Sequence, residues 1–563
     1  MTTQSDSTTS GDAAPHTSWL PMTVIAMAQI LMSFNVNALP VSIGGIVASF
    51  DTSPTTVGTA IVTYSLFVAG FVMLGAKMAA LFGSRLVFQA MVVLFGAAMV
   101  IMTLSPSATM MIVAQGIAGA AAAALIPTLV VLIATNYKGR QQAQALGWLG
   151  AAEAMGGVLA FLVAGFLGTW VGWRYPFGLL VVLAACVFVL SKQLKPVESQ
   201  PGLRIDGVGM LLAALAIILI SVGFNNINKW GLLLARPAAP FSLLGLSPAL
   251  AMIVVGIVLG QAFFAWSKKR QPPQKTPLIA LEVIETPQER SAVFSMFIVI
   301  VLGSAISFLI PLYIQIVQGR SSLQTALAII PYSLSIFAAA ILVLRLHDRL
   351  SSRHIARCAF VVLAGGLMLL AVVIRNEWET FMVILGLIVI GLGQGALATL
   401  LFNVLVSASP NELAGDVGSL RGVTNHLAGG LGTAIIGALA IGLLSASITR
   451  HLLDNPTIPA ELKAQVDLDN VTFVSNDRLL GVLQRTMATP DQVAEAVRIN
   501  TEARLQALKL SFLVLAGLGL LAIFPSGGLP RYVAGEVLGR PTTEYVAERA
   551  RTEPRPAAQA KRR

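Results

Sequence analysis

Long apolar runs, separated by short polar turns, repeat from one end of the chain to the other. About fourteen of these runs reach the roughly 20 residues that a helix needs to cross a bilayer. They lie approximately at residues 19–43, 57–80, 86–104, 108–134, 143–168, 174–191, 206–225, 247–266, 291–315, 323–344, 356–374, 379–405, 419–446 and 508–527. The pattern predicts an all-α polytopic membrane protein with about 14 transmembrane helices.

Two similar turns indicate an internal repeat. Residues 77–85 read KMAALFGSR and residues 345–353 read RLHDRLSSR. Each turn falls between the second and third helices of a six-helix block, if the seventh and eighth helices are an insertion. Two six-helix halves with a substrate path between them are typical of alternating-access carriers. The predicted parts are a disordered cytoplasmic tail (1–17), an N-terminal bundle (18–191), two inserted helices with flanking loops (192–290), a C-terminal bundle (291–527) and a basic cytoplasmic tail (528–563).

A long polar segment, residues 447–507, separates the last two runs. Near its end, Thr489-Pro490-Asp491-Gln492 is typical of a capping box with proline at the first helical position. A helical pattern continues from there into the last run. The segment is predicted to form an external helical hairpin stacked on the last helix.

Composition and charge give the chain an orientation. It is 56% hydrophobic and only 11% charged, with a mean hydropathy of +0.80 and a formal charge of +11. The basic residues gather in loops on the side of the two termini, which predicts that both termini are cytoplasmic in a bacterial inner membrane. Scattered through short loops, they do not favour nucleic-acid binding. The only two cysteines, Cys186 and Cys358, do not indicate a disulfide framework.

One acidic side chain lies deep within an apolar run. Glu153 stands near the middle of residues 143–168, among recurring glycines and alanines. A carboxylate at that depth is costly, so its default interpretation is a functional one. The alternative is a protonated, hydrogen-bonded residue that packs helices together.

Other polar side chains within the runs each need a partner in lipid. Some are expected to line a substrate cavity, and others to bridge helices. The candidates are Asn35, Asn37, Gln115, Gln394, Asn403 and Asn425. His426 is a second candidate for a coupling group, because histidine changes charge near neutral pH. Its alternative role is packing against Asn425 or Asn403.

Four motifs resemble those of one transporter family. They are Leu312-Tyr313-Ile314-Gln315 with Gly319, Ser322-Leu323-Gln324 and Pro331; Gln115-Gly116-Ile117-Ala118-Gly119-Ala120 with Pro127; Trp173-Arg174; and the stretch from Gly415 to Gly432 that contains His426. Together they are similar to the fourteen-helix drug:proton antiporters of the major facilitator superfamily. The resemblance implies that family's fold, with two six-helix bundles plus two extra helices. It also implies conformational motifs at Lys77, Gly83, Arg85, Asp348, Arg349, Arg353, Gly156 and Gly165.

The N-terminal half departs from the family's pattern. The first-helix aspartate position is Leu31, and the fourth-helix arginine position is Ala114. Ala80 and Leu81 replace the Asp-Arg pair after the second helix, and the fifth-helix proline position is Phe161. These losses remove groups that would load and release a proton, so Glu153 could replace the lost carboxylate.

The sequence contains no catalytic or nucleotide-binding motif. It has neither a His-Glu-x-x-His pair nor a phosphate-binding Gly-x-x-x-x-Gly-Lys-Ser/Thr loop. We therefore expect a non-enzymatic secondary carrier that exports hydrophobic or amphiphilic compounds, with no cofactor except a possible proton gradient. Its expected partners are a small hydrophobic or lipid substrate and membrane lipids, and it is expected to be a monomer. The alternatives are a lipid transporter or flippase without proton antiport, and a non-transporting scaffold or sensor.

Overall fold

The computed structural model describes residues 18–137, 139–195, 206–242, 245–269, 286–347, 349–376, 380–408, 414–453, 455, 473–484 and 489–530. Within these ranges every regular element is a helix. Judged by length and composition, 13 helices in the described part of the chain can span a membrane, and α7 is a shorter apolar helix of 17 residues. The prediction of an all-α polytopic protein with about 14 spanning helices is confirmed.

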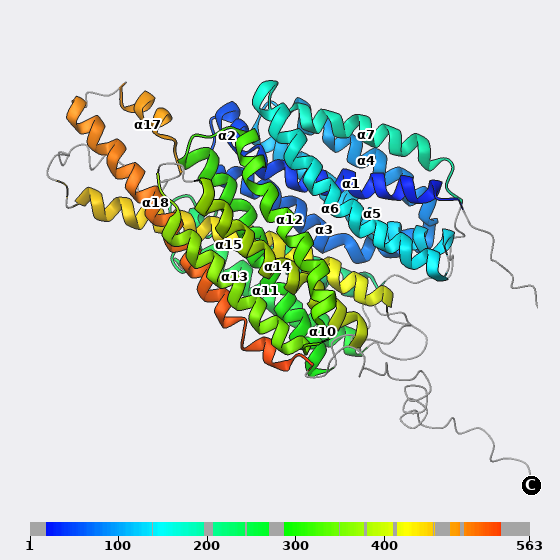
Figure 1. The fold of residues 1–563 in the computed structure, drawn as a ribbon. Coiled ribbons are helices and arrows are strands. Elements are labelled where there is room, and N and C mark those ends of the chain that lie inside the picture. Colours follow the sequence, from blue (N-terminus) through cyan, green and yellow to red (C-terminus); the bar gives the residue numbers. More distant parts are fainter. Residues whose placement is uncertain are drawn as a thin grey trace, which may run out of the picture.

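Six long helices and one short one form the N-terminal bundle, drawn in blue to cyan (Figure 1). They are α1 (Leu20–Val41), α2 (Ile43–Phe50), α3 (Pro54–Phe82), α4 (Ser84–Leu104), α5 (Ala108–Asn136), α6 (Gly139–Trp170) and α7 (Tyr175–Ser191). The short helix α2 was not predicted, because its residues continue the apolar run of α1. It ends at Asp51, whose φ of 50° is the left-handed conformation that aspartate tolerates better than most residues.

The C-terminal bundle contains the second set of six long helices. Its elements are α11 (Pro287–Pro311), the π-helix η2 (Leu312–Val317), α12 (Ser322–His347), α13 (Ser352–Val373), α14 (Thr380–Ala408), α15 (Ala414–Leu453), α17 (Asn476–Leu483), α18 (Pro490–Leu521) and the 3₁₀-helix η5 (Pro525–Gly528). α11 begins at a capping box, in which the Glu289 amide donates to Thr286 Oγ1 at 3.2 Å and the Thr286 amide donates to Glu289 Oε2 at 2.8 Å. The same arrangement at Thr489 and Gln492 begins α18, as the sequence predicted.

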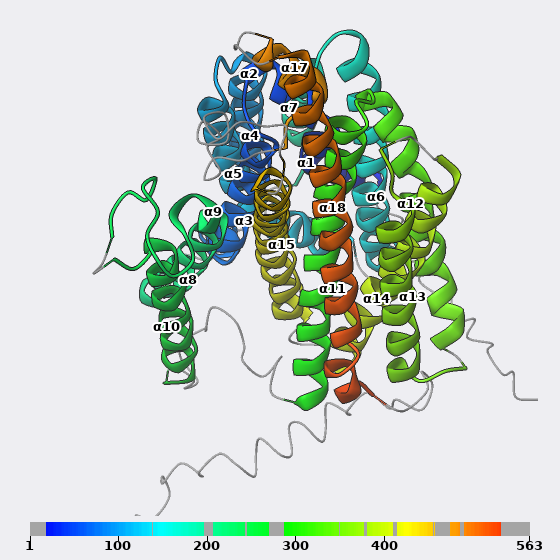
Figure 2. The same cartoon turned by 90° about the vertical axis from the view of Figure 1, so that its left-hand side faces the viewer.

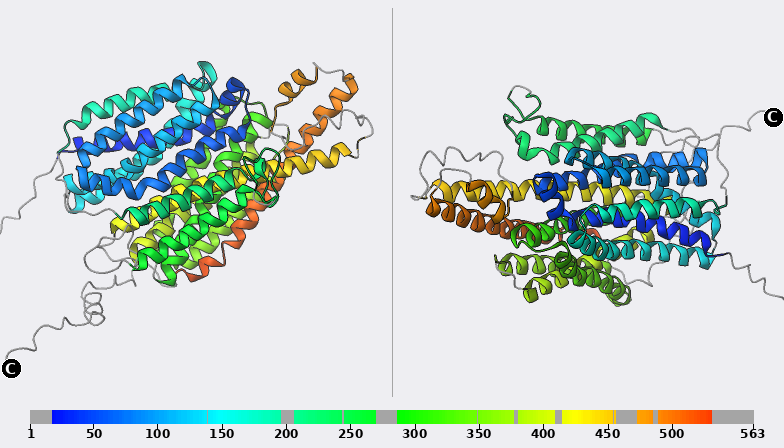
Figure 3. Two further views of the ribbon diagram at one scale, coloured as in Figure 1. Left: turned by 180° about the vertical axis from the view of Figure 1, so that it is seen from behind. Right: turned by 90° about the horizontal axis from the view of Figure 1, so that it is seen from above.

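The inserted helices lie beside the two bundles. They are α8 (Gly207–Asn225), the single turn α9 (Ile227–Trp230) and α10 (Pro248–Lys269). Ile217 of α8 forms a cluster with Leu66 and Ala69 of α3, and Leu427 of α15 packs against this cluster. Figure 3 shows the pair at one edge of the molecule. Because α8 touches one helix from each bundle, the insertion covers the seam between α3 and α15.

The helix ends define two faces of the molecule. We call the end that carries α2, α17 and the start of α12 the hairpin face. The opposite end, with the turns at Gly83, Lys192 and Ser351, is the loop face. α15 has 40 residues and α18 has 32, so at 1.5 Å per residue they are about 60 and 48 Å long. Both exceed the roughly 30 Å of a bilayer core and extend beyond the other helices at the hairpin face (Figure 1).

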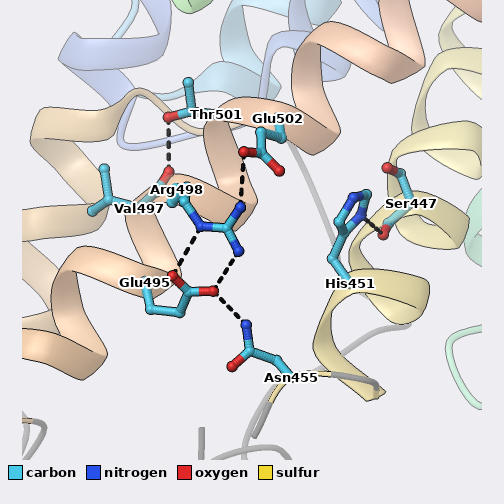
Figure 4. A network of polar contacts seen from close by, with 8 residues as sticks. All are labelled: Ser447, His451, Asn455, Glu495, Val497, Arg498, Thr501 and Glu502. Atoms are coloured by element: carbon cyan, nitrogen blue, oxygen red, sulfur yellow. Dashed lines mark hydrogen bonds and ion pairs between the residues drawn. The ribbon is translucent and has the colours of Figure 1, made fainter. Parts of the chain in front are cut away.

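Polar contacts hold the projecting ends of α15 and α18 together. Glu495 accepts hydrogen bonds from Arg498 of its own helix and from Asn455, which follows α15 (Figure 4). Nearer the bundle, Ser447 Oγ donates to Gln506 Oε1 at 2.8 Å. The described part of the predicted external hairpin is thus made of two long helix ends with α17 beside them. Residues 454, 456–472 and 485–488 of that segment lie outside the described ranges.

Small residues set the distance between α3 and α5. A Cβ atom added at Gly75 of α3 would overlap the Cα atom of Ala124 in α5, whereas one added at Gly70 of the same helix would meet nothing within 4 Å. Without a hydrophobic effect in lipid, such close backbone approach is the main source of helix association.

Gly75→Ala is therefore expected to lower the thermal unfolding temperature of the detergent-solubilised protein. Overpacking of this kind costs about 1–3 kcal/mol. The matched control is Gly70→Ala, which is expected to melt like the parent. Equal melting temperatures for the two variants would contradict tight α3–α5 packing as a source of stability.

Candidate functional site

Glu153 lies on the inner side of α6. Its side chain is exposed, but it stands apart from the lipid-facing side of the helix. That side is marked by large exposed apolar side chains, namely Trp148, Met155, Leu159, Leu162 and Phe166. At about 100° per residue, Glu153 points about 150° away from the mean direction of this stripe. The carboxylate therefore faces the interior of the molecule, not lipid.

On one flank of Glu153, α6 packs closely against α1. Ser33 Oγ of α1 donates to the Glu153 backbone oxygen at 2.7 Å. A Cβ atom at Gly156 would lie 2.8 Å from Ser33 Cβ, so glycine is needed for this approach. Asn37, a predicted site residue, donates through Nδ2 to the Ser33 backbone oxygen at 2.8 Å, and its side chain lies beside Gly157. Asn37 and Glu153 thus share the α1–α6 contact.

On the other flank, α6 meets α12 of the opposite bundle near the hairpin face. A Cβ atom at Gly165 would lie 2.7 Å from Ala326 Cβ, and the Leu323 amide donates to Thr169 Oγ1 at 3.0 Å. Glu153 is 12 residues, or about 18 Å, from Gly165 along the helix toward the loop face. The exposed carboxylate thus lies on the loop-face side of a closed contact between the two bundles.

Asn35 and Gln115 pair with each other. Asn35 Nδ2 donates to Gln115 Oε1 at 2.9 Å, and Gln115 Nε2 donates to Asn35 Oδ1 at 3.1 Å. Both side chains are fully buried between α1 and α5. Two amides that satisfy each other in this way join helices, so this geometry favours the packing interpretation over direct substrate contact.

Gln394 occupies a similar position in the C-terminal bundle. Tyr332 of α12 donates its hydroxyl to Gln394 Oε1 at 2.5 Å. The Gln394 amide group fills the space that a side chain at Gly303 of α11 would need. Gln394 therefore joins α11, α12 and α14, and it is partly exposed.

The remaining predicted polar residues are not gathered into one cluster. Asn403 of α14 and Asn425 of α15 are half-buried. The His426 ring stands edge-on to the Tyr64 ring of α3, with 6.3 Å between their centroids. His426 therefore lies at the α3–α15 seam, in contact with an aromatic ring of the other bundle. Among the described residues, no group of three His, Cys, Asp or Glu side chains could hold a metal ion.

Gln315 belongs to one of the family-like motifs, but the sequence does not indicate its role. The structure places it in η2, where Gln315 Oε1 accepts from the Gly44 amide at 2.7 Å and Nε2 donates to the Val41 backbone oxygen at 2.9 Å. Gly44 has no room for a Cβ atom because this side chain lies against it. Gln315 thus joins the two bundles at the hairpin face. Its position in a π-helix, a distortion common at functional sites, could not be read from the sequence.

The two repeated turns make the same contact in each half. Arg85 Nη2 donates to the Lys192 backbone oxygen at 2.7 Å, just after the last helix of the N-terminal bundle. Arg353, at the same place in the second turn, donates from Nε and Nη2 to the Leu529 backbone oxygen at 3.1 and 2.9 Å. A cation near helix C-termini is favourable because of the helix dipole. Both arginines therefore tie the third helix of a half to the end of its sixth.

The other predicted residues of these two turns show no comparable contact among the described residues. Gly83 has a φ of 87°, a conformation that favours glycine, and it separates α3 from α4. Lys77 is half-buried and Arg349 is exposed. Asp348, the predicted partner in a charge pair, lies outside the described residues.

Comparison with known proteins gives a consistent result. The model of the Major Facilitator Superfamily matches residues 25–433. The probable actinorhodin transporter of Streptomyces coelicolor is 25% identical over 497 residues, covering 85% of this chain and 82% of its own length. The multidrug resistance protein Stp of Mycobacterium tuberculosis is 24% identical over 515 residues, covering 90% and 91%. The multidrug efflux pump LfrA of Mycolicibacterium smegmatis is 23% identical over 470 residues, covering 82% and 87%.

Solved structures share the fold. A D-xylose–proton symporter superposes with a TM-score of 0.57 at 11% identity, covering 92% of this chain and 99% of its own. An inward-facing, occupied bacterial homologue of the human lysosomal transporter Spinster has a TM-score of 0.55 at 14% identity, covering 90% and 95%. At such identities the likeness concerns the fold alone.

Proposed function

This chain belongs to the Major Facilitator Superfamily, and from that premise we propose that it exports hydrophobic or amphiphilic compounds across the bacterial inner membrane by alternating access. It is not an enzyme. The support comes from relatives that align over most of the chain and are named for efflux or drug resistance. A scaffold without transport is not favoured by these relatives.

The observation that carries the proposal is the position of Glu153. An exposed carboxylate faces the interior, between the α1 contact and the α12 contact, on the loop-face side of the closure at Gly165. The Gly165 and Gln315 contacts hold the hairpin face closed, so we infer that a compound reaches the carboxylate from the loop face. Release then requires these contacts to break and the loop face to close, which is the exchange of states that alternating access demands.

A single interior carboxylate favours positively charged ligands. Either a proton or a lipophilic cation would neutralise Glu153, and competition between the two is the simplest basis for antiport. We propose that Glu153 replaces the family carboxylate that is absent at Leu31. The chain would then need no cofactor, and its energy source would be the proton gradient.

A lipid substrate remains a second candidate because of an apolar groove on the outside of the bundles. The groove has a volume of about 350 Å³ and lies between α8, α9 and α15. Its lining is Phe224, Ile227, Ile435, Ala438, Leu439, Gly442 and Leu443. A groove lined by apolar side chains suits an acyl chain. Transport of a labelled phospholipid should therefore be measured beside that of a drug.

Export can be tested in a bacterial host that lacks its own efflux pumps. Expression of the chain is expected to raise the tolerated concentration of tetraphenylphosphonium, a lipophilic cation, several-fold. A neutral dye and an anionic dye are each expected to give a smaller effect. Unchanged tolerance to all three compounds, with the protein present in the membrane, would contradict an export function.

We also propose that the hairpin face is external, that both termini are cytoplasmic and that one chain is the working unit. The orientation follows from the basic loops on the loop face. In a background with Cys186 and Cys358 replaced by serine, Val482→Cys in α17 is expected to react with an impermeant maleimide in intact cells. Leu350→Cys at the loop face is the matched site, exposed like Val482, and should react only after membrane disruption. The reverse pattern would invert the topology.

A further inference from the structure

A short segment at the hairpin face crosses from one bundle to the other. We call residues 473–484 the strap; it consists of an extended stretch, Phe473 to Ser475, followed by α17. The strap belongs to the C-terminal half of the sequence, between α15 and α18. In Figure 2, α17 lies at the top of the molecule, near α2 of the N-terminal bundle.

One end of the strap is clamped to α18 by a buried arginine. The Arg504 side chain is 1% exposed, and it donates from Nη1 to the Val474 backbone oxygen and from Nη2 to Asn476 Oδ1, both at 2.7 Å. Asn500, one turn earlier, donates to the same two oxygens at 3.3 and 3.1 Å. Both Nη atoms of Arg504 are thus used, whereas its buried Nε has no hydrogen-bond partner. Because breaking the Nη contacts would leave more of a buried guanidinium unpaired, the strap and α18 form one unit.

The same arginine also reaches the turn that closes the hairpin face. Arg504 Nη1 lies 3.2 Å from the Ile316 backbone oxygen in η2. The preceding residue, Gln315, makes the hydrogen bonds to Gly44 and Val41 of the N-terminal bundle. Arg504 therefore connects the strap with the principal polar closure between the bundles.

Phe473 acts as a wedge between the bundles. It is 3% exposed and lines a small hollow together with Pro54 and Thr55 at the start of α3. The same hollow is lined by Phe308 and Leu312 of α11 and η2, and by residues of α15. The hollow it shares with these residues has no room for a water molecule. Separation of the bundles at this face would expose the Phe473 ring or pull it out of place.

The other end of the strap is attached to the N-terminal bundle by charge. Arg478 forms an ion pair with Asp51 and lies with Nη1 3.4 Å from the Thr52 backbone oxygen. Asp51 is the left-handed residue that ends α2, so its position is set by the backbone of the N-terminal bundle. The ion pair is partly exposed and hence weak, but it exists only while the two bundles are close at this face.

We propose that the strap is an intramolecular latch that stabilises the conformer closed at the hairpin face. This proposal rests on the proposed function, in which the chain is a carrier with two conformers, but it does not depend on any particular substrate. The wedge and the ion pair both cross between bundles, and the Arg504 clamp makes them release together. Opening the hairpin face therefore requires the strap either to leave the N-terminal bundle or to move with α18.

The latch can be tested by distance measurements that need no transport. Spin labels at Met110→Cys in α5 and Val372→Cys in α13, both exposed near the hairpin face, report the separation of the bundles in the background without Cys186 and Cys358. Phe473→Ala and Arg478→Ala are both expected to increase the hairpin-face-open population. For Arg478→Ala the increase is about two- to fivefold, the range for a partly exposed ion pair, and for Phe473→Ala, which removes a buried ring, it is larger. Val482→Ala, an exposed change within the strap, is the control and should leave the distribution unchanged.

A double-variant comparison separates the latch from simple loss of structure. Asp51→Asn removes the charge but keeps a residue that tolerates the left-handed conformation, so it should open the hairpin face in the same direction as Arg478→Ala, and combining the two should open it no further than Arg478→Ala alone. Unchanged distances in both Phe473→Ala and Arg478→Ala, or fully additive effects of Asp51→Asn and Arg478→Ala, would overturn the proposal. A failure to transport any compound, with distances that still respond to the strap, would instead reject the proposed function and leave the latch intact.

Discussion

Glu153→Gln is expected to reduce export by at least about tenfold while leaving the amount of folded protein unchanged. Glutamine is similar in volume and still forms hydrogen bonds, but it cannot carry the negative charge. The contact that Glu153 makes with Ser33 uses its backbone oxygen, so the substitution leaves α1–α6 packing intact. A tenfold change corresponds to about 1.4 kcal/mol of interaction free energy.

The matched control for this experiment is Met155→Gln. Met155 is on the exposed apolar stripe of α6, two residues away from Glu153 but on the lipid-facing side. An amide there should lower stability slightly and leave export per folded molecule unchanged. If Glu153→Gln exported at the parental rate, the carboxylate would be a packing residue, and coupling would have to be sought at another group such as His426.

Gly165→Leu is expected to abolish transport by preventing closure of the hairpin face. A single Cβ atom at this position already lies 2.7 Å from Ala326 Cβ and 3.2 Å from the Ser322 backbone oxygen. A leucine side chain cannot fit unless α6 and α12 separate. In the closed conformer the overpacking would cost about 1–3 kcal/mol or more. A penalty of that size shifts a two-state population by roughly five- to a hundredfold toward the open form.

Two measurements distinguish this effect from misfolding. The spin-label pair at the hairpin face should report a longer distance, and the thermal unfolding temperature should fall little, because the clash is relieved in the open conformer. Gly517→Leu in α18 is the control, since a Cβ atom there meets nothing within 4 Å. Parental distances and transport in Gly165→Leu would show that the α6–α12 contact is not a moving closure.

The spanning helices could be predicted because lipid demands long apolar segments whatever their neighbours are. The run predicted at residues 419–446 lies within α15, and the helical pattern after Pro490 is one continuous helix with the last span. α2 and η2 were missed for a related reason. Each continues an apolar run without a break in composition, and only contacts from the other bundle distinguish them.

The partners of polar residues could not be predicted in the same way. Asn35 and Gln115 are 80 positions apart, and no local pattern indicates that their amides satisfy each other. Gln315 and Arg504 act through backbone oxygens, which carry no sequence signal. Glu153 could be identified from the sequence because a carboxylate within an apolar run is costly in itself. Its inward direction follows from the helical period. Its position on the loop-face side of the Gly165 contact could be found only from the positions of α1 and α12.

The most direct test is flux through the purified chain reconstituted in proteoliposomes, with tetraphenylphosphonium as the tracer and with an imposed pH gradient. Alternating access coupled at Glu153 predicts tracer movement against the proton flow, above that of protein-free vesicles, and its loss in Glu153→Gln. A parallel sample with a fluorescent phospholipid identifies a lipid substrate. Movement of neither compound above protein-free vesicles, with or without the gradient, would contradict a role for this chain as an exporter.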